Sequence, residues 1–405
     1  MTTRLHIYPH KRYYRYSDSP VADWLDDFAA WLNAAGYCRP VVRSHLSAVR
    51  LSLEPLAPLP LDTRFSRTDL EQIVAFPGRP EPHRLARLAF ERFLRDRGRW
   101  IEPRSVEPHA ELIAAFSHYL VEMRGLAPAT VEQHVWTARA FLRTALPEGA
   151  PLADLSDVDV EGFIAERSRQ MTRRSLGGEA SRLRVFLRFC VERAKLPEGM
   201  EAIDIPRRYR DERPPRAIAW PLVLQLLDSI DRSTPVGLRD HTVFYLMAHY
   251  GLRTGEVPLL TLDSVDWQAG TLRIQQSKTR SVLLLPLTEP AADVLQRYLR
   301  DGRPPTERPE LFLRSIAPIG PITRGAIAQA FRRRVRRSGL PLDDASPYGL
   351  RHSFAMRLLD RNVGVKAIGD LLGHRHLQTT SVYLRLQADA LRDVALPLPG
   401  DCDAY

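Results

Sequence analysis

The sequence predicts a mainly helical protein of several domains, with one small antiparallel sheet in its C-terminal half. Helical spacing of apolar residues dominates residues 21–200 and returns after residue 217. A strand–turn–strand pattern, TLRIQQSKTRSVLLLPL, begins at Thr271. Between these parts, residues 201–216 combine prolines with charge and show no apolar period, which is typical of a linker. The 405 residues suffice for two or three domains.

The charge of the chain indicates a polyanionic partner. Lys and Arg total 58 against 48 Asp and Glu, which gives a net charge of +10 and a sequence pI of about 9.8. Such a balance favours a nucleic-acid partner. A coding bias towards Arg is the alternative, because the chain contains four lysines, namely Lys11, Lys195, Lys278 and Lys366.

The cysteines and the apolar runs exclude other classes. Three scattered cysteines, Cys38, Cys190 and Cys402, predict neither a disulfide framework nor a metal site. Cys190 lies in an apolar helical pattern and is expected in a core. No apolar run reaches the roughly eighteen residues of a membrane span, and the N-terminus has no apolar signal core. We therefore expect a cytoplasmic protein.

The N-terminal half consists of an extension and two similar helical modules. Residues 1–20 are basic and aromatic, and could be an arm along a DNA backbone or a flexible leader. Residues 21–100 and 108–200 share their breaks, which favours duplication over convergence of amphipathic helices. Three intervals are identical in the two modules, as shown by Gly36, His45, Arg50 and Leu53 beside Gly125, His134, Arg139 and Leu142. In the same way Ser66 and Asp69 correspond to Ser156 and Asp159.

The second module carries candidate DNA contacts. We expect Thr130 to cap a helix that presents basic side chains towards phosphates. The loop MTRRSLGGEAS adds two arginines. A solvated face is the alternative. The candidates are His134, Arg139, Arg143, Arg173 and Arg174.

The part after the linker, from residue 217, carries the chemistry. In GLRTGEVPLL, Arg253 and Glu256 are three residues apart, so on a helix Glu256 can hold the guanidinium; a plain structural ion pair is the alternative. Lys278 lies at the hairpin turn, and a lysine in an Arg-rich chain favours proton transfer, since Arg stays protonated. Residues 325–337 form a helix with a basic end, another candidate DNA surface or a solvated face, comprising Arg332, Arg333 and Arg336.

Residues 346–383 are expected to form three helices whose ends carry polar side chains. Ser346 and Pro347 suit the start of the first, and its Leu350, Phe354 and Leu358 form a buried stripe. Asn362 can cap the second helix, and Gly373 can end it in a left-handed conformation just before His374. Thr379 or Thr380 can start the third, with Tyr383 in its first turn.

These residues resemble the tyrosine recombinase (phage integrase) family. The family has Gly-Leu-Arg-x-x-Glu, a hairpin lysine, a His-x-x-Arg box, Leu-Gly-His and a tyrosine nine residues later. The matching residues are Arg253, Glu256, Lys278, Arg351, His374 and Tyr383. The segment RGLAPATVEQHVWTARAFLR resembles the family's SAM-like core-binding domain. The resemblance implies a core-binding domain at 108–200, an α+β catalytic domain at 217–397 and a tail at 398–405. The shared intervals then favour a duplicate of the core-binding domain at 21–100.

The resemblance also implies a mechanism. Tyr383 would attack a phosphodiester of double-stranded DNA, giving a 3′-phosphotyrosine and a free 5′ hydroxyl. Arg253 and Arg351 would brace the phosphate oxygens, with a third hydrogen bond from His374, and Lys278 would protonate the leaving oxygen. The bond energy is kept, so no ATP or other cofactor is expected, and the cations of the site are expected to replace a metal. A homotetramer, as a dimer of dimers, is the expected assembly.

The first position of the box is Tyr348 instead of His, which departs from the family pattern. A phenol can donate a hydrogen bond to phosphate but has no basic nitrogen. Either Tyr348 keeps the electrostatic half of the role, or it only packs and His352, one turn on, stands in. Integration, excision or resolution of a mobile element is the expected function. A type IB-like topoisomerase and a weakly active or inactive DNA-binding relative are the alternatives.

Overall fold

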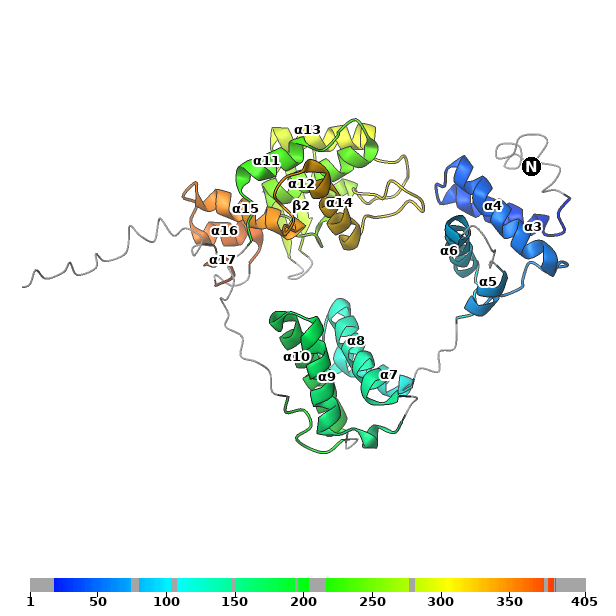
Figure 1. Ribbon diagram of the computed structural model, residues 1–405. Coiled ribbons are helices and arrows are strands. Elements are labelled where there is room, and N and C mark those ends of the chain that lie inside the picture. The colour runs from blue at the N-terminus through cyan, green and yellow to red at the C-terminus, as the bar shows by residue number, and fades with distance from the viewer. Residues whose placement is uncertain are drawn as a thin grey trace, which may run out of the picture. The chain divides into compact units, whose positions relative to one another are not determined.

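The computed structural model (Figure 1) describes residues 18–73, 80–102, 108–147, 150–193, 196–203, 216–276, 281–374, 378–381 and 383, with the backbone alone at 80–83. By its packing the chain separates into two compact units, residues 103–212 and the remaining residues. Several predictions concern residues outside this description, namely the N-terminal arm, most of the linker, Lys278, Cys402, the helix expected after Tyr383 and the tail.

The first helical module packs around aromatic side chains. Its helices are α3 (Ala22–Ala34), α4 (Arg39–Leu53), α5 (Arg67–Ile73) and α6 (Pro80–Asp96), with a short 3-10 turn at Glu54–Leu56. Trp24 meets Phe65 edge to face at 5.6 Å between ring centroids, and Phe28 meets Phe90 at 5.2 Å. These four rings are at most 3% exposed, so they form the centre of this core.

The second module has the same order of elements. Helix α7 (Ala110–His118) continues into a π-helical turn (Tyr119–Met123) and is followed by α8 (Pro128–Ala145), a 3-10 turn (Leu152–Asp154), α9 (Asp157–Gln170) and α10 (Arg173–Glu192). Phe116 and Phe186 meet at 5.1 Å in its core, and Cys190 is buried there as predicted. Ser66 and Asp69 bond to each other at the start of α5, as Ser156 and Asp159 do at the start of α9. The predicted correspondence therefore extends to a shared capping geometry.

Two boundaries of the second module correct the sequence analysis. Helix α8 begins at Pro128 with Ala127 as its cap, so Thr130 is not the cap. Proline has its φ preset for a helical first turn and no N–H to satisfy there, which explains the earlier start. Thr172 accepts a hydrogen bond from the Ser175 N–H and caps α10. Arg173 and Arg174 accordingly lie in the first helical turn and not in a loop.

The third part contains a small sheet and a helical core. Strands β1 (Val265–Asp266), β2 (Thr271–Gln275) and β3 (Val282–Pro286) form an antiparallel sheet in sequence order. The helices are α11 (Trp220–Asp228), α12 (Pro235–Tyr250), α13 (Glu289–Arg297), α14 (Arg324–Ser338), α15 (Pro347–Leu359), α16 (Val365–Leu372) and α17 (Gln378–Ser381), with a π-helical turn at Tyr298–Gly302 and 3-10 turns at Val257–Leu259 and Leu262–Ser264. Helix α12 is buried along most of its length and packs against α15. The mainly helical fold with one small antiparallel sheet is therefore confirmed.

Helices α15 to α17 follow the prediction with two corrections. Ser346 and Pro347 begin α15 as expected; Leu350 is fully buried, while Phe354 and Leu358 are half-buried. Asn362 does not cap α16: it has a φ of 58° in the turn after α15, and Gly364 caps α16. Asparagine tolerates this left-handed conformation better than most residues. Helix α17 starts at Gln378, and Tyr383 follows the helix instead of lying in its first turn.

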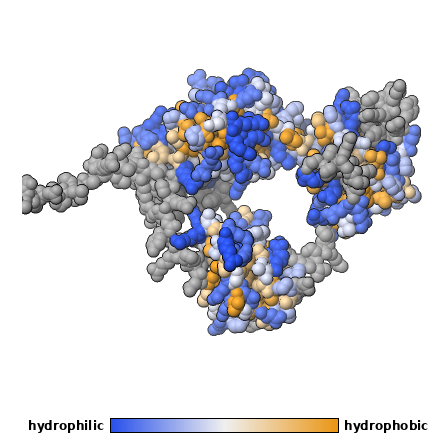
Figure 2. Space-filling model, viewed as in Figure 1, coloured by the Kyte–Doolittle hydropathy of each residue, from blue (hydrophilic) through white to orange (hydrophobic). Residues whose placement is uncertain are grey.

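The surface is largely hydrophilic in the view of Figure 2, with small scattered apolar patches. Among the described helices, none combines the length and the apolar composition that a membrane crossing needs.

Candidate active site

Arg253 lies in the turn that follows α12. Gly251 ends that helix with a φ of 64°, and a Cβ there would come within 2.8 Å of Phe354 and Leu372, so glycine is required on both counts. The Glu256 carboxylate accepts from the Arg253 backbone N–H at 2.8 Å and from its Nη1 at 2.6 Å. The predicted ion pair therefore forms, but across a turn and not on an α-helix.

Arg351 is held at the centre of the site by backbone oxygens. Its side chain is 2% exposed on α15. Nη1 donates to the Gly251 carbonyl at 2.5 Å, and Nη2 donates to the Leu372 carbonyl at 2.6 Å. Burial and the nearby charge of Arg253 lower the pKa of Arg351 to about 10, so the guanidinium is still charged at neutral pH.

The Leu372 carbonyl joins the two arginines. Arg253 Nη2 donates to the same oxygen at 3.3 Å. This carbonyl is at the C-terminus of α16, where unpaired carbonyls carry partial negative charge that favours cations. A guanidinium has five N–H donors. Within the described part of the chain, Arg351 makes three side-chain hydrogen bonds, which leaves two of its N–H donors. Arg253 makes two, which leaves three of its N–H donors.

His374 follows Gly373, whose φ of 61° ends α16 as predicted. Its Nε2 lies 3.2 Å from Arg351 Nη2, and its Nδ1 lies 2.8 Å from Thr380 Oγ1. Because a guanidinium only donates, Nε2 accepts and Nδ1 carries the proton that goes to Thr380. Burial, with the charges of Arg351 and Arg253, lowers the pKa of His374 to about 4, so the ring is neutral.

Tyr383 is buried beside these groups and bonds to a histidine. Its side chain is 2% exposed, and its Oη lies 2.9 Å from His352 Nδ1. Burial raises the pKa of Tyr383 to about 12, with Tyr348 adding to the rise and the two arginines opposing it. The hydroxyl is therefore protonated at neutral pH.

Tyr348 lies at the edge of the site and is more exposed than the other members. It is 43% exposed, and its ring meets the His352 ring edge to face at 4.6 Å. Its hydroxyl has no hydrogen-bond partner among the described residues. Lys278 lies outside the described residues. Gln276, the last described residue before it in the sequence, is buried and packs against Gly373.

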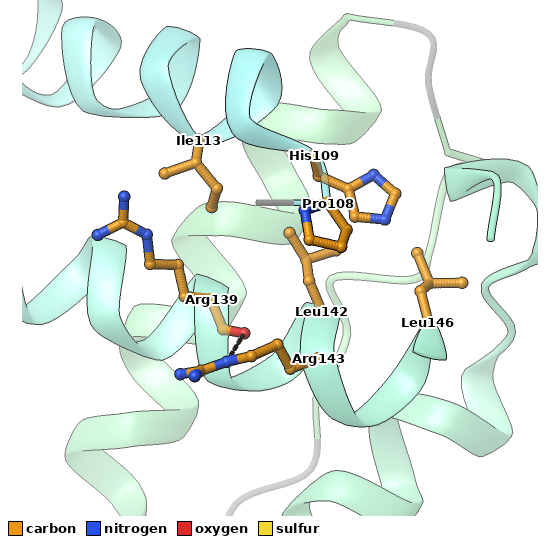
Figure 3. A pocket seen from close by; sticks show the side chains of 7 residues that line it. All are labelled: Pro108, His109, Ile113, Arg139, Leu142, Arg143 and Leu146. Atoms are coloured by element: carbon orange, nitrogen blue, oxygen red, sulfur yellow. Dashed lines mark hydrogen bonds between the residues drawn. The ribbon is translucent and has the colours of Figure 1, made fainter. Parts of the chain in front are cut away.

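The candidate DNA contacts are placed unevenly. Arg139 and Arg143 are exposed on successive turns of α8 and line a small pocket with Pro108, His109, Ile113, Leu142 and Leu146 (Figure 3). Arg143 Nε donates to the Arg139 carbonyl at 3.3 Å. His134 is half-buried against Phe116, which makes it a poorer candidate. Arg173 and Arg174 are exposed.

On α14 the basic end is divided between surface and core. Arg332 and Arg336 are exposed, whereas Arg333 lies 3.5 Å from the buried carboxylate of Asp240. Arg334 bonds to the same carboxylate at 2.8 Å. Part of this charge thus belongs to a structural ion cluster.

Two contacts were not predicted from the sequence. His352 was named only as a possible stand-in, and its bond to Tyr383 spans 31 positions. Thr380 was expected only to start a helix, yet it fixes the His374 ring. The one available signal was the four-residue spacing of Tyr348 and His352, which puts both on one face of α15.

In a helical domain with a three-stranded antiparallel sheet, two arginines, a histidine and a tyrosine thus gather from the turn after α12, from α15 and from the ends of α16 and α17, which is the arrangement that the resemblance to the tyrosine recombinases implies. The model of the phage integrase family matches residues 222–389, and that of the phage integrase N-terminal SAM-like domain matches residues 113–194. The chain belongs to the phage integrase family, the tyrosine recombinases, and is a site-specific DNA recombinase.

Relatives along most of the chain agree with this assignment. The protein named as integrase/recombinase y4rF of Sinorhizobium fredii is 30% identical and spans 93% of this chain and 91% of its own length. Tyrosine recombinase XerD of Lacticaseibacillus casei is 31% identical over 68% of this chain and 94% of its own. A crystal structure of a lambda integrase dimer bound to a COC′ core site shares the fold, with a TM-score of 0.52 and 17% identity over 66% of this chain and 96% of its own.

Proposed function

We propose that this recombinase cuts duplex DNA by attack of Tyr383 on a phosphodiester, forms a 3′-phosphotyrosine, and rejoins the strand to a different 5′ end, in integration, excision or resolution of a mobile element. The observation that carries the proposal is the convergence of Arg253 and Arg351 on one carbonyl, with His374 bonded to Arg351 and a buried tyrosine beside them.

The two arginines are proposed to bind the non-bridging oxygens of the phosphate. Five N–H donors remain on them within the described residues, enough for bidentate contacts to both oxygens. Glu256 supports this role by fixing Arg253, since a buried carboxylate with two bonds to one arginine leaves it little rotational freedom. Catalysis at phosphorus depends mainly on such positioning and electrostatic stabilisation.

His374 and Tyr348 are proposed to add hydrogen bonds to the same phosphate. In the free protein, His374 Nε2 accepts a hydrogen bond from Arg351. His374 can donate from this nitrogen only after a bound phosphodiester has drawn the Arg351 guanidinium away. The negative charge of the phosphodiester also offsets the positive charge that lowers the pKa of His374. Tyr348 is 43% exposed, so its hydroxyl is proposed to contact the bound DNA backbone. Lys278 is proposed to protonate the departing 5′ oxygen.

DNA affinity is proposed to come from Arg139, Arg143, Arg173 and Arg174 in a core-binding domain at 108–200, joined by a linker at 201–216 to a catalytic domain at 217–397 that adds Arg332, Arg333 and Arg336. Residues 21–100 are proposed to be a duplicate of the core-binding domain, which the shared caps of α5 and α9 support. Two DNA sites exchanging strands need four nucleophiles, so a homotetramer on DNA is the proposed assembly, acting in the cytoplasm.

The chemistry of the cut ends tests this proposal. Duplexes carrying a nick beside the cleavage site lose the short 5′-hydroxyl fragment, so the covalent complex accumulates. We expect a protein–DNA adduct stable in SDS and a released end that polynucleotide kinase labels without prior phosphatase treatment. An adduct that carries the 5′ end of the strand, with a free 3′ hydroxyl, would overturn the proposal.

A further inference from the structure

The nucleophile's hydroxyl contacts a histidine that lies outside the family motif. His352 Nδ1 is 2.9 Å from Tyr383 Oη, and no other described side chain makes a hydrogen bond to that oxygen. The motif position that carries histidine in the family holds Tyr348, one turn earlier on α15. The chain thus lacks a basic nitrogen at the motif position and has one, on His352, in contact with the Tyr383 hydroxyl.

The ring of His352 is held between two tyrosines. The Tyr348 ring meets it at 4.6 Å and 89° between planes, and the Tyr383 ring meets it at 5.4 Å and 62°. Edge-to-face contacts of this kind favour defined ring orientations. The exposed Tyr348 therefore both orients the imidazole and covers it from one side, while its own hydroxyl stays free to contact a phosphate.

The charges around His352 favour its neutral form. Among the described residues, Arg351 is the adjacent cation on α15, His374 faces His352 from the end of α16, and the two phenols contact its ring. Burial first, and Arg351 second, lower the pKa of His352 to about 4. A neutral imidazole with a lone pair on Nδ1 can accept the phenolic proton.

We propose that His352 is the catalytic base of strand cleavage, and that Tyr348 and His352 divide between them the two tasks of the missing box histidine. This inference rests on the proposed function of Tyr383. As the bond from Tyr383 Oη to phosphorus forms, the O–H bond breaks and its proton passes to His352 Nδ1, giving an imidazolium. The bond from phosphorus to the 5′ oxygen breaks, and that oxygen takes a proton from a separate acid, the role proposed for Lys278.

The pKa values of Tyr383 and His352 indicate when the phenolic proton moves during cleavage. Because the pKa of Tyr383 is about 12 and that of His352 about 4, a phenolate does not form in advance. The proton moves only as phosphorus withdraws electrons from the phenolic oxygen. In rejoining, the imidazolium returns the proton to Tyr383 as the 5′ hydroxyl displaces it, so His352 serves both directions by microscopic reversibility.

The test begins by selecting a DNA substrate from a randomised pool. A pool of nicked duplexes with a randomised core is incubated with the full-length wild-type chain, and the DNA recovered from the SDS-stable adduct is sequenced and resynthesised. Single-turnover cleavage is then compared for wild type, His352→Asn, His352→Ala and Tyr348→Phe. Asparagine can accept a hydrogen bond at this place but cannot take a proton.

We expect His352→Asn to cleave about 10²-fold or more slowly than wild type with unchanged DNA affinity, since a positioned base contributes about 10²–10⁴-fold. Added imidazole should restore cleavage by His352→Ala, with a pH profile that follows the imidazole. A matched control is His249→Asn, because His249 is also half-buried with its pKa lowered to about 4. Its ring stacks on the Tyr245 ring at 4.1 Å and meets the Trp220 ring at 5.2 Å, and neither residue belongs to the site. This control should cleave at the wild-type rate.

A sulfur substrate separates the base from the acid. When the 5′ bridging oxygen is replaced by sulfur, the leaving group needs no proton, so this substrate should rescue Lys278→Ala but not His352→Asn. Wild-type cleavage by a folded His352→Asn, or its rescue by the sulfur substrate, would overturn the role of His352 while leaving the function of Tyr383 intact. Absence of any wild-type adduct from the randomised pool would instead overturn both.

Discussion

The guanidinium groups of Arg253 and Arg351 donate to one oxygen, the carbonyl of Leu372, at 3.3 and 2.6 Å. Two cations this close repel each other by roughly a few kcal/mol even with partial screening. The Glu256 carboxylate and the negative end of α16 offset part of that repulsion. A phosphodiester would offset the rest, so the free site is arranged to gain from binding an anion.

Glu256→Gln should impair cleavage and stability together. Glu256 is 2% exposed and its Arg253 partner 14%, and removing one charge of a buried pair costs about 3–5 kcal/mol. We expect a lower melting temperature and cleavage slower by about 10- to 100-fold, measured on the recovered nicked duplex. Glu71→Gln is the control, because its pair with Arg67 is exposed, and both quantities should stay unchanged. Equal behaviour of the two variants would show that Glu256 does not position Arg253.

Salt dependence should report the contacts made by α10. Each neutralised phosphate contributes about −0.9 to the slope of log affinity against log salt, so Arg173→Gln with Arg174→Gln should make the slope shallower by about 1.8. Arg169→Gln is the control, because that exposed arginine already pairs with Glu166 at 3.0 Å. Fluorescence anisotropy over a series of salt concentrations measures all three proteins. An unchanged slope in the double variant would remove the start of α10 from the DNA surface.

The stability of the protein should fall between pH 6.5 and pH 4. His241, His249, His352 and His374 each have their pKa lowered from 6.5 to about 4, chiefly by burial. In this window the unfolded chain binds protons that the folded chain does not, so unfolding is favoured as the pH falls. The lowered carboxyl pKa values of Asp69 and Asp159 add to this decline at its acid end, because an unfolded Asp begins to bind protons as the pH approaches 3.8. Melting temperatures measured across the window should decline steadily, and a constant value would contradict the burial of these rings.

A fragment that begins at Arg104 should fold without the first helical module. The second module and the third part each have a hydrophobic core made of their own residues. We expect a cooperative thermal transition and retained binding to the recovered duplex, measured by circular dichroism and anisotropy. The first module does contact the third part, where the Ile319 N–H donates to the Ala35 carbonyl at 3.0 Å. An insoluble fragment, or one without a cooperative transition, would mean that the rest of the chain needs this contact to fold.

The sequence singled out the two arginines, His374 and Tyr383 by their match to the family motif, and local signals such as the glycine that ends α16 placed His374 at a helix end. It predicted the Arg253–Glu256 contact on the wrong element, since a spacing of three residues fits a turn as well as a helix. The bonds of Tyr383 to His352 and of His374 to Thr380 depend on how the chain after α16 folds back on α15. No periodicity encodes that return.

Mapping the covalent adduct of the wild-type protein tests the nucleophile most directly. After nuclease and protease digestion, mass spectrometry should find a nucleotide attached through its 3′ phosphate to the peptide that contains Tyr383. Tyr383→Phe should give no adduct, because it lacks the attacking hydroxyl. It should bind DNA with wild-type affinity, because Tyr383 is buried in the free protein. A nucleotide on another residue, or a wild-type yield of SDS-stable adduct from Tyr383→Phe, would contradict the assignment.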